Sequence, residues 1–527
     1  MYCMYLPSFH FFIPILLLTM TSTTSITAIS SAAPGKQRAG GAHILMFPFP
    51  AQGHMLPLLD LVHQFALRAT ATTTFTVLVT PKNLPILNPI LTQHPSIVKT
   101  LVLPFPTPEN SPIPPGVENV KNLPPSYFLP MITTMSKLYD PLLNWFKSHP
   151  CPPTYIISDF FLGWTQDLAS QIGIRRIVFS PSGALTLSIS SCLWRDLRTP
   201  TDDSSDKENA LIPFPEVPGF PKYPWWQLSP LYHAYVQGKK NGGNSNSDDL
   251  EQLRKYFLAN VESWGMIFNS FHELEGIYLD HMKRAYFGGD KRVWAVGPLS
   301  QSGPTERGGT NSEQSSDIIP WLDTCDDHSV VYICFGSQVV LNNNQMEAVA
   351  VGLEKSGVRF LWCVKEPTVG HVSGEYGMVP SGFEDRTAGR GLVVRGWAPQ
   401  VLILKHQAVG SFLTHCGWNS VLESIGTGVP ILAWPMGADQ FFNAALLVEQ
   451  MKVAVRVCEG EKAIPNEDGL AQCMAESVAT SSTSKSEMRM KAKELKQAAT
   501  DAVNGNGNGR GSSFKDLDDL VHHLLSN

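Results

Sequence analysis

The chain has 527 residues, 16% of them charged, and a formal net charge of −6. This length predicts two or three domains with large hydrophobic cores, and the charge balance argues against a nucleic-acid-binding protein, which would need a basic surface. The nine cysteines are odd in number and include no CxxC pair, and there is no N-x-[ST] sequon. Both features favour reduced thiols and a cytoplasmic location.

The first 40 residues contain a short apolar run, Phe9 to Leu18, followed by a stretch rich in serine and threonine and a Ser-Ala-Ala sequence. That composition is typical of a signal peptide, but no Lys or Arg precedes the run. About ten apolar residues are too few to cross a bilayer, so no stable membrane insertion is expected. Residues 1–40 are interpreted as an N-terminal extension, either disordered, with Met20 as an alternative start, or targeting-like.

Between residues 41 and 300, strand-like and helix-like runs alternate. A buried strand from His43 to Pro50 turns into a helix from Met55 to Ala69, and a second strand, Phe75 to Thr80, completes a β-α-β unit. The first turn lacks the G-x-G-x-x-G sequence that a dinucleotide-dependent oxidoreductase would carry there. The later strands expected in this half are Tyr155–Ser158, Arg176–Phe179, Gly265–Ser270 and Val293–Val296.

Less regular stretches separate these elements. Prolines dominate a long loop from Pro104 to Pro125, and helical periodicity follows from Tyr127 to Phe146. The segment from Lys239 to Asp249 carries no core-forming residues and is expected to be a solvated insertion. Gln301 to Ser316 is polar and rich in Gly, Ser and Thr, so we place the linker between two domains at residues 301–320.

The alternation of strand and helix restarts at residue 321. Its strands are expected at Val330–Phe335, Arg359–Val364, Leu392–Arg395, Ala408–Thr414, Pro430–Trp434 and Val453–Cys458. A helix is expected from Gln345 to Lys355, and helices continue to about Val503. The glycine-rich run Asn504 to Ser513 has no preceding strand and no following lysine, so it is interpreted as a flexible connection to a last helix. Two successive β/α halves predict two Rossmann-like domains.

The stretch from Trp397 to Gln440 gathers groups that suit a nucleotide-sugar. The strand Ala408–Thr414 runs into the turn His415-Cys416-Gly417, and a helix begins after it. A strand that leads through a glycine turn into a helix directs free N–H groups and the positive end of the helix dipole at one point, which suits a phosphate.

The polar and aromatic side chains of this stretch extend the predicted site. Glu423 lies one helical turn after Asn419, where a carboxylate can accept two ribose hydroxyls. Asp439-Gln440 follows the next strand, at the edge where open α/β sheets bind ligands. Trp397 offers a flat face for a base.

The whole stretch resembles the signature of the plant secondary-product glycosyltransferases, the family 1 UDP-sugar-dependent enzymes. The segments FPAQGHMLPLLDL and FTVLVTPKN resemble the branch that acts on flavonols and small phenolics. The resemblance implies an α/β GT-B fold, in which two Rossmann-like domains face an interdomain cleft. It places an acceptor-binding domain at residues 41–300, the linker at 301–320, a UDP-sugar-binding domain at 321–503, and a flexible connection with a C-terminal helix at 504–527.

The resemblance also implies roles for individual side chains. Uracil, diphosphate, ribose and sugar are then held by Trp397, Ala398, Gln400, Ser337, His415, Gly417, Asn419, Ser420, Glu423, Trp418, Asp439 and Gln440. In this set Trp397 stacks on uracil, Glu423 takes the ribose, and a Gln at position 440 resembles the members that use glucose. Where the family often has a second serine after Ser337, this chain has Gln338, which leaves the contacts to the phosphates open there.

Transfer of a sugar to a hydroxyl requires a base that removes the proton. His54 fits this role because it lies in a turn at the carboxyl end of the first strand, although a capping or core histidine is the alternative. Asp159 ends another strand and could orient the imidazole, while a role as a helix N-cap is the alternative and is compatible with the first. The FPAQGH and SDxFLGW contexts resemble those of the family's catalytic His and Asp.

The predicted reaction is a single inverting displacement. His54 takes the acceptor proton, the oxygen attacks the anomeric carbon of a UDP-hexose, most simply UDP-glucose, and UDP leaves to give a β-glycoside. A small phenolic or flavonoid acceptor is expected to contact Tyr127, Phe128 and Trp164. We expect a monomer that needs no cofactor and no metal beyond the UDP-sugar co-substrate. A catalytically silent UDP-sugar-binding protein, transfer of rhamnose or xylose, and a dinucleotide-dependent oxidoreductase remain alternatives.

Overall fold

The computed structural model describes residues 41–107, 111–201, 206–240, 247–290, 292–299, 315–367, 374–479, 483–507 and 509–526. The predictions for residues 1–40, for most of the linker at 301–320 and for the centre of the insertion at 239–249 lie outside these ranges. The boundaries proposed for the domains stay predictions.

The first lobe is built on a seven-stranded parallel sheet in the order β3-β2-β1-β4-β5-β8-β9. Its strands are β1 (His43–Phe47), β2 (Thr74–Val79), β3 (Val98–Val102), β4 (Tyr155–Asp159), β5 (Arg175–Ser180), β8 (Gly265–Phe268) and β9 (Val293–Ala295). The strand order reverses between β1 and β4. In open α/β sheets such a reversal forms a crevice at the carboxyl ends of the strands, where ligands bind.

Both faces of this sheet are covered by apolar packing. In β1, Leu45 and Phe47 belong to one hydrophobic cluster, whereas Ile44 and Met46 belong to another. Successive side chains of a strand point to opposite faces of the sheet. The sequence HILMF, which is buried at every position, is therefore suited to a parallel strand between two layers.

Helices and short 3-10 turns connect the strands of this lobe. They are α1 (Gln52–Ala66), η1 (Pro81–Leu87), α2 (Asn88–Gln93), η2 (Val120–Asn122), η3 (Pro125–Tyr127), α3 (Phe128–Ser136), α4 (Tyr139–Ser148), η4 (Phe160–Leu162), α5 (Thr165–Ile172), α6 (Ala184–Asp196), η5 (Trp225–Gln227), α7 (Pro230–Lys240), α8 (Ser247–Glu262) and α9 (His272–Tyr286). A separate antiparallel hairpin is formed by β6 (Leu211–Pro213) and β7 (Lys222–Pro224).

The helix expected from Tyr127 to Phe146 is divided in the structure into η3, α3 and α4. Pro141 is the third residue of α4. A proline has no backbone N–H and its ring clashes with the preceding turn inside a helix, but it is tolerated in the first turn. A continuous helix would have placed Pro141 in its interior, so a new helix begins at Tyr139.

The second lobe repeats the same plan on a six-stranded parallel sheet in the order β12-β11-β10-β13-β14-β15. Its elements are α10 (Ser315–Asp323), β10 (Val330–Cys334), α11 (Asn343–Ser356), β11 (Arg359–Val364), α12 (Phe383–Arg386), β12 (Gly391–Arg395), α13 (Gln400–Lys405), β13 (Val409–Thr414), α14 (Trp418–Thr427), β14 (Ile431–Ala433), α15 (Gln440–Ala445), η6 (Leu446–Met451), β15 (Ala454–Arg456), α16 (Glu467–Val478) and α17 (Thr483–Asn504). Here the order reverses between β10 and β13, which creates a second crevice.

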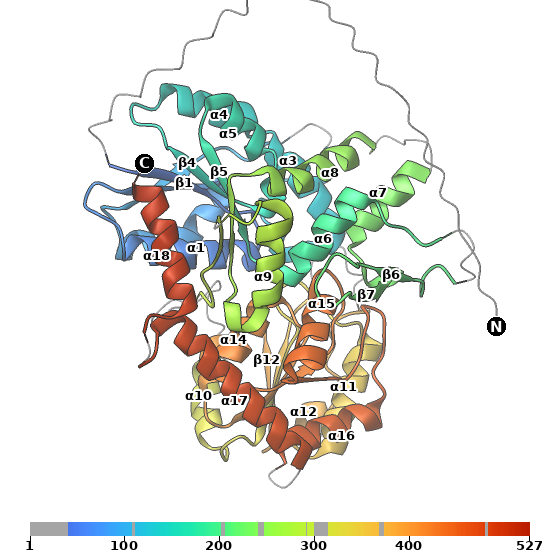
Figure 1. Cartoon of the computed structure of the whole chain (residues 1–527). Helices are drawn as coiled ribbons and strands as arrows, with labels where there is room; N and C mark the ends of the chain where they lie inside the picture. Colours follow the sequence, from blue (N-terminus) through green and yellow to red (C-terminus); the bar gives the residue numbers. More distant parts are fainter. Residues whose placement is uncertain are drawn as a thin grey trace, which may run out of the picture. The chain divides into compact units, whose positions relative to one another are not determined.

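The last helix, α18 (Ser512–Leu525), returns to the first lobe, as the red ribbon in Figure 1 shows. Its leucines Leu517, Leu520 and Leu524 join the hydrophobic cluster on one face of the first sheet. The indole N–H of Trp294 donates to a carboxylate oxygen of Asp519 at 2.7 Å. The chain end thus ties the two lobes together, and residues 40–527 form one compact unit.

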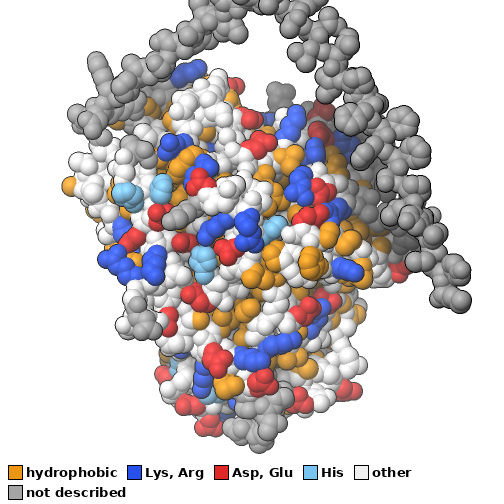
Figure 2. Space-filling model, viewed as in Figure 1, with side chains coloured by type: hydrophobic (Ala, Val, Ile, Leu, Met, Phe, Trp, Pro, Cys, Tyr) orange, Lys and Arg blue, Asp and Glu red, His pale blue; other side chains and the backbone are white. Residues whose placement is uncertain are grey.

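The surface carries charges of both signs. On the face in Figure 2, basic and acidic side chains are interspersed and do not gather into one basic area. In the described part of the chain, no helix combines the length and the apolar composition that a segment crossing a bilayer needs.

Candidate active site

The two predicted catalytic side chains meet at the crevice of the first sheet. The Nδ1 atom of His54, in the first turn of α1, lies 2.8 Å from Oδ2 of Asp159, at the end of the neighbouring strand β4. The Asp159 side chain is fully buried, and its Oδ1 accepts the backbone N–H of Phe161 at 2.9 Å. Asp159 is therefore both the partner of His54 and the N-cap of η4, so its two expected roles coexist.

The contact with Asp159 decides which ring nitrogen of His54 can act as a base. A carboxylate accepts a hydrogen bond, so Nδ1 of His54 carries the proton and Nε2 of the neutral ring is unprotonated. The side chain is 15% exposed. The ring packs against Phe49 and Phe161, with ring centroids 5.5 and 5.1 Å away. These contacts and the bond to Asp159 hold the ring in one orientation.

The second crevice brings together two glycine turns around His415. Gly336 follows β10 with φ +76°, and Gly417 precedes α14. A Cβ atom at Gly336 would lie 2.6 Å from Cε1 of His415, and one at Gly417 would lie 2.6 Å from Nε2. Both positions therefore need glycine to leave room for the imidazole. The turn after β10 also contains Ser337, whose backbone carbonyl accepts a hydrogen bond from the Lys365 ammonium.

The start of α14 is suited to an anion. Gly417 is its N-cap residue and provides no side-chain hydrogen bond to the first turn. The first N–H groups of a helix have no acceptor within the helix, and the helix dipole adds partial positive charge there. The turn of Ser337, the ring of His415 and the start of α14 thus surround one point that can bind a phosphate.

Burial lowers the pKa of His415 to about 4 from an ordinary value of 6.5, so its ring is neutral at neutral pH. Between these values the unfolded chain binds more protons than the folded chain, and the free energy of unfolding therefore falls as the pH decreases. Between pH 7 and pH 5, we expect the free energy of unfolding of the wild type to fall by about 1 to 2 kcal/mol more than that of His415→Gln. Denaturant unfolding of both proteins at the two pH values measures this; equal losses would contradict it.

Gln400, assigned to the base, and Glu423, assigned to the ribose, form one hydrogen-bonded group with Ser420, which is assigned to the diphosphate. The side-chain amide of Gln400 donates to Oγ of Ser420 at 3.0 Å and to a carboxylate oxygen of Glu423 at 2.7 Å. Ala398 is buried next to them. The Lys121 ammonium of the first lobe lies 5.4 Å from the ring centroid of Trp397. The structure therefore places this part of the predicted set in one neighbourhood.

The sugar end of the predicted set lies against the first lobe. Ser182, after β5, donates to Oδ2 of Asp439 at 2.9 Å. Burial raises the pKa of Asp439, while its hydrogen bonds with Asn443 and Ser182 and the charge of His54 act in the opposite direction. The side-chain oxygen of Gln440 accepts the backbone N–H groups of Met436 and Gly437 and so shapes the loop before α15.

Two residues of α14 join the lobes directly. The side-chain amide of Asn419 donates to the carbonyl of Gly53 at 3.0 Å, next to His54. The indole N–H of Trp418 donates to the carbonyl of Asn269 at 2.7 Å, and the Trp418 side chain is buried. The structure thus commits the Trp418 indole to the lobe interface, which differs from the sugar contact that the family resemblance implies for this side chain.

The predicted acceptor residues are only partly brought together. Phe128 stacks on Phe49 with ring centroids 5.8 Å apart, and it also contacts Phe161. Tyr127 precedes it and is half-buried. Trp164 is 3% exposed and packs on Phe47 in the core, so its position does not fit an acceptor contact.

No sequence pattern had singled out Phe49 or Phe161. Phe49 follows β1, between that strand and His54, and Phe161 follows β4, which ends at Asp159; aromatic residues at these strand ends were the available signal. Ser182 was also missed, although it follows the neighbouring strand β5 at the same edge of the sheet.

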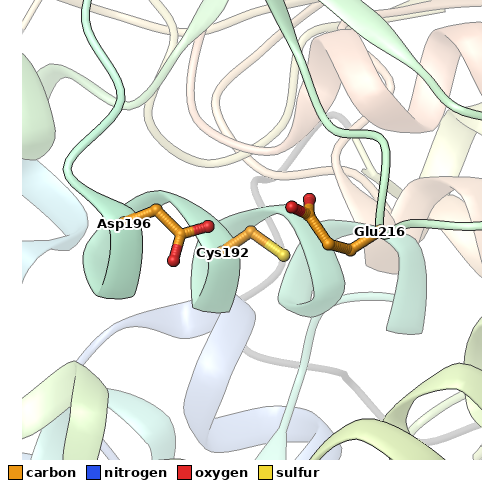
Figure 3. A group of neighbouring side chains, drawn as sticks. All are labelled: Cys192, Asp196 and Glu216. Carbon is orange, nitrogen blue, oxygen red and sulfur yellow. The ribbon is translucent and has the colours of Figure 1, made fainter. Parts of the chain in front are cut away.

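One group of possible metal ligands lies outside the crevices. Figure 3 shows Cys192 and Asp196 one turn apart on α6, with Glu216 directed toward them. Arg198 bridges the two carboxylates at 2.7 Å each, and Arg195 lies 2.6 Å from Asp196. Burial raises the pKa of the Cys192 thiol. A neutral thiol and carboxylates already paired with arginines make a poor cation site.

Comparison with known proteins agrees with this geometry. A family model described as UDP-glucoronosyl and UDP-glucosyl transferase matches residues 307–491. UDP-glycosyltransferase 89B2 of Stevia rebaudiana is 52% identical over 484 residues, which cover 92% of this chain and 98% of that protein. The chain belongs to the UDP-glycosyltransferase family. Flavonol 3-O-glucosyltransferase UGT89B1 of Arabidopsis thaliana is 50% identical to this glycosyltransferase, over 92% of the chain and 96% of that protein.

Solved structures give the same result for the fold of this UDP-glycosyltransferase. The crystal structure of Arabidopsis thaliana UGT89C1 complexed with UDP-L-rhamnose superimposes with a TM-score of 0.72 at 37% identity, covering 92% of this chain and all of that one. Another crystal structure of UGT89C1 is complexed with quercetin. The two Rossmann-like domains of the GT-B fold, predicted from the sequence, are thereby confirmed.

Proposed function

We propose that this enzyme transfers glucose from UDP-glucose to a hydroxyl of a flavonoid or small phenol and forms a β-glycoside. The observation that carries the proposal is the 2.8 Å contact between His54 and Asp159. The hydrogen bonds from Asn419 to Gly53 and from Ser182 to Asp439 join the first lobe to the second lobe next to this pair. A base in the first lobe thus lies next to the side chains that would hold the sugar in the second lobe.

The arrangement of the second lobe supports the donor site proposed here. Uracil stacks on Trp397 near Ala398 and Gln400, and the ribose is held by Glu423. The diphosphate lies at the start of α14, where we assign it to His415, Asn419, Ser420 and Ser337. Asp439 and Gln440 hold the sugar hydroxyls. A carboxylate next to an amide supplies both acceptors and donors to several hydroxyls.

The proposed chemistry is one displacement at the anomeric carbon. Nε2 of His54 removes the proton from the acceptor hydroxyl as the oxygen attacks. The imidazolium that forms is stabilised by the buried carboxylate of Asp159. UDP leaves from the opposite face of the sugar, and its new negative charge meets the N–H groups at the start of α14. Attack opposite the leaving group inverts the anomeric configuration.

The acceptor site is proposed at the aromatic wall beside His54. Phe49, Phe128 and Phe161 present flat apolar faces to a planar aglycone, and such faces favour offset stacking. The proteins most useful for comparison act on or bind compounds of this shape: the Arabidopsis relative is named a flavonol 3-O-glucosyltransferase, and UGT89C1 was crystallised with quercetin. UGT89C1 was also crystallised with UDP-L-rhamnose, so rhamnose is the sugar to test against glucose.

The substrate assignment is tested by incubating the enzyme with UDP-glucose, UDP-xylose or UDP-rhamnose and a panel of flavonols and simple phenols. Products are identified by mass. We expect the highest rate with UDP-glucose, a single added hexose on a phenolic hydroxyl, and an unchanged rate in excess EDTA. UDP binding without any product would indicate a catalytically silent binder, and complete loss of activity in EDTA would indicate a metal. We also propose that the enzyme is a monomer in the cytoplasm. The location is proposed because the cysteines are odd in number and include no CxxC pair, and because there is no N-x-[ST] sequon.

A further inference from the structure

Behind the His54–Asp159 pair lies a fully buried arginine. Arg176, on β5, is 1% exposed. Its Nε donates to Oγ of Ser158 at 2.9 Å, and one Nη donates to Oδ1 of Asn260 at 3.0 Å and to Oγ of Ser263 at 2.9 Å. The other Nη donates to the backbone carbonyl of Asp159 at 3.3 Å. The guanidinium is therefore directed at the strand end that carries the partner of His54.

The same network fixes the backbone on both sides of Asp159. Ser158, which accepts from Arg176, also shares a 2.7 Å hydrogen bond with Thr165. Asn260, which accepts from Arg176, donates in turn to the carbonyl of Phe160 at 2.9 Å. Residues 158–160 are thus held by one connected set of buried polar groups, and such sets position their members strongly when every partner is satisfied.

Charge balance gives this arginine a second role. A buried carboxylate beside a neutral imidazole would be an uncompensated charge, which is costly in a protein interior. Burial lowers the pKa of Arg176 to about 9, and the charges of Asp159 and Asp167 oppose this effect. The guanidinium remains protonated at neutral pH, so it supplies the compensating positive charge.

We propose that Arg176 is a positioning residue that holds the strand end of Asp159 and, through its charge, keeps the carboxylate of Asp159 ionised while His54 is neutral. This inference rests on the proposed function, because it assigns a role to the His54–Asp159 pair. It adds an internal cation that no sequence motif had indicated. The resting state is then a neutral set of one arginine, one carboxylate and one neutral imidazole.

The charged groups around this pair set the expected direction of a pH effect. Asp159 faces His54 from β4, Arg176 faces Asp159 from β5, Asp167 on α5 acts on the pKa of Arg176, and His54 acts on the pKa of Asp439 in the second lobe. Loss of the Arg176 charge makes it harder to ionise the carboxylate of Asp159 and easier to protonate the imidazole of His54. Both changes move the active protonation state to higher pH.

The test is the pH dependence of kcat/KM for Arg176→Met and Arg176→Lys. For Arg176→Met we expect the acid side of the profile to move up by about one pH unit, so that the loss of kcat/KM relative to the wild type is about tenfold greater at acid pH than at pH 8. A buried lysine is charged at the acid pH values concerned, so Arg176→Lys should keep the acid side near that of the wild type even if its thermal stability falls.

If Arg176→Met does not fold, two substitutions at hydrogen-bond partners of Arg176, neither of which enlarges the side chain, still test the proposal. Asn260→Asp places a second carboxylate on the guanidinium and should move the acid side upward, whereas Ser263→Ala removes one hydrogen bond without a charge and should not. The proposal would be overturned if the acid side of the kcat/KM profile did not move in Arg176→Met and Asn260→Asp, and if their losses of activity only followed their losses of thermal stability. If His54→Ala is inactive in the same series, that result leaves the proposed function intact; an active His54→Ala would sink both.

Discussion

His54→Ala is expected to lower kcat by about a thousandfold while the affinity for UDP stays within about threefold of the wild type. The reason is that Nε2 of His54 is the proposed acceptor of the hydroxyl proton, whereas the nucleotide is held by the second lobe. Steady-state kinetics at saturating UDP-sugar give kcat, and titration calorimetry with UDP gives the affinity. Asp159→Asn should show a loss of the same kind, since it removes the charge that stabilises the imidazolium.

A second histidine–aspartate pair provides a matched control. Nε2 of His406 lies 3.1 Å from Oδ1 of Asp323 outside the two crevices. His406→Ala removes a histidine–carboxylate contact of the same kind and should leave kcat unchanged. Activity of His54→Ala within tenfold of the wild type would refute the assignment of the base.

Gly336→Ala is expected to weaken UDP binding at least about tenfold. The new Cβ would lie 2.6 Å from the His415 ring, and the backbone at Gly336, with φ +76°, disfavours a side chain. The imidazole must then move away from the point where the Ser337 turn and the start of α14 converge. Titration of the folded variant with UDP measures the effect, since the proposed phosphate contacts are lost together.

Gly389→Ala separates the effect of backbone strain from the effect of displacing the His415 ring. Gly389 has a similar φ of +81°, but nothing lies within 4 Å of the position of its Cβ. Both variants carry the backbone strain, of about 1 kcal/mol or more, and only Gly336→Ala displaces His415. Equal UDP affinities for the two variants would show that the ring position does not matter for binding.

The elements that sequence patterns predicted well are those whose pattern is local. The apolar runs of β1, β4 and β10 are buried on both faces, so their composition alone marks them as parallel strands. β3 was not predicted, because it lies at the edge of the sheet and its sequence VKTLV is largely exposed. The β6–β7 hairpin was missed for a related reason: its strands have three residues each.

The candidate site shows the same division between local and distant information. The turn before α14 and the strand ends at His54 and Asp159 are readable because each consists of neighbours in sequence, and the fold places the latter two in contact. The indole contact of Trp418 and the bond from Ser182 to Asp439 join residues far apart in sequence. Only the packing of the two lobes decides such contacts, whereas the pairing of β4 with β5 within the first lobe places Arg176 behind Asp159.

The most direct measurement is a crystal structure of this chain with a non-transferable UDP-glucose analogue and a flavonol. We expect one acceptor hydroxyl within about 3 Å of Nε2 of His54 and about 3 to 3.5 Å from the anomeric carbon, on the face opposite the diphosphate. A complex in which the acceptor hydroxyl approaches the sugar from a side that His54 cannot reach would contradict the central claim that the first lobe supplies the base.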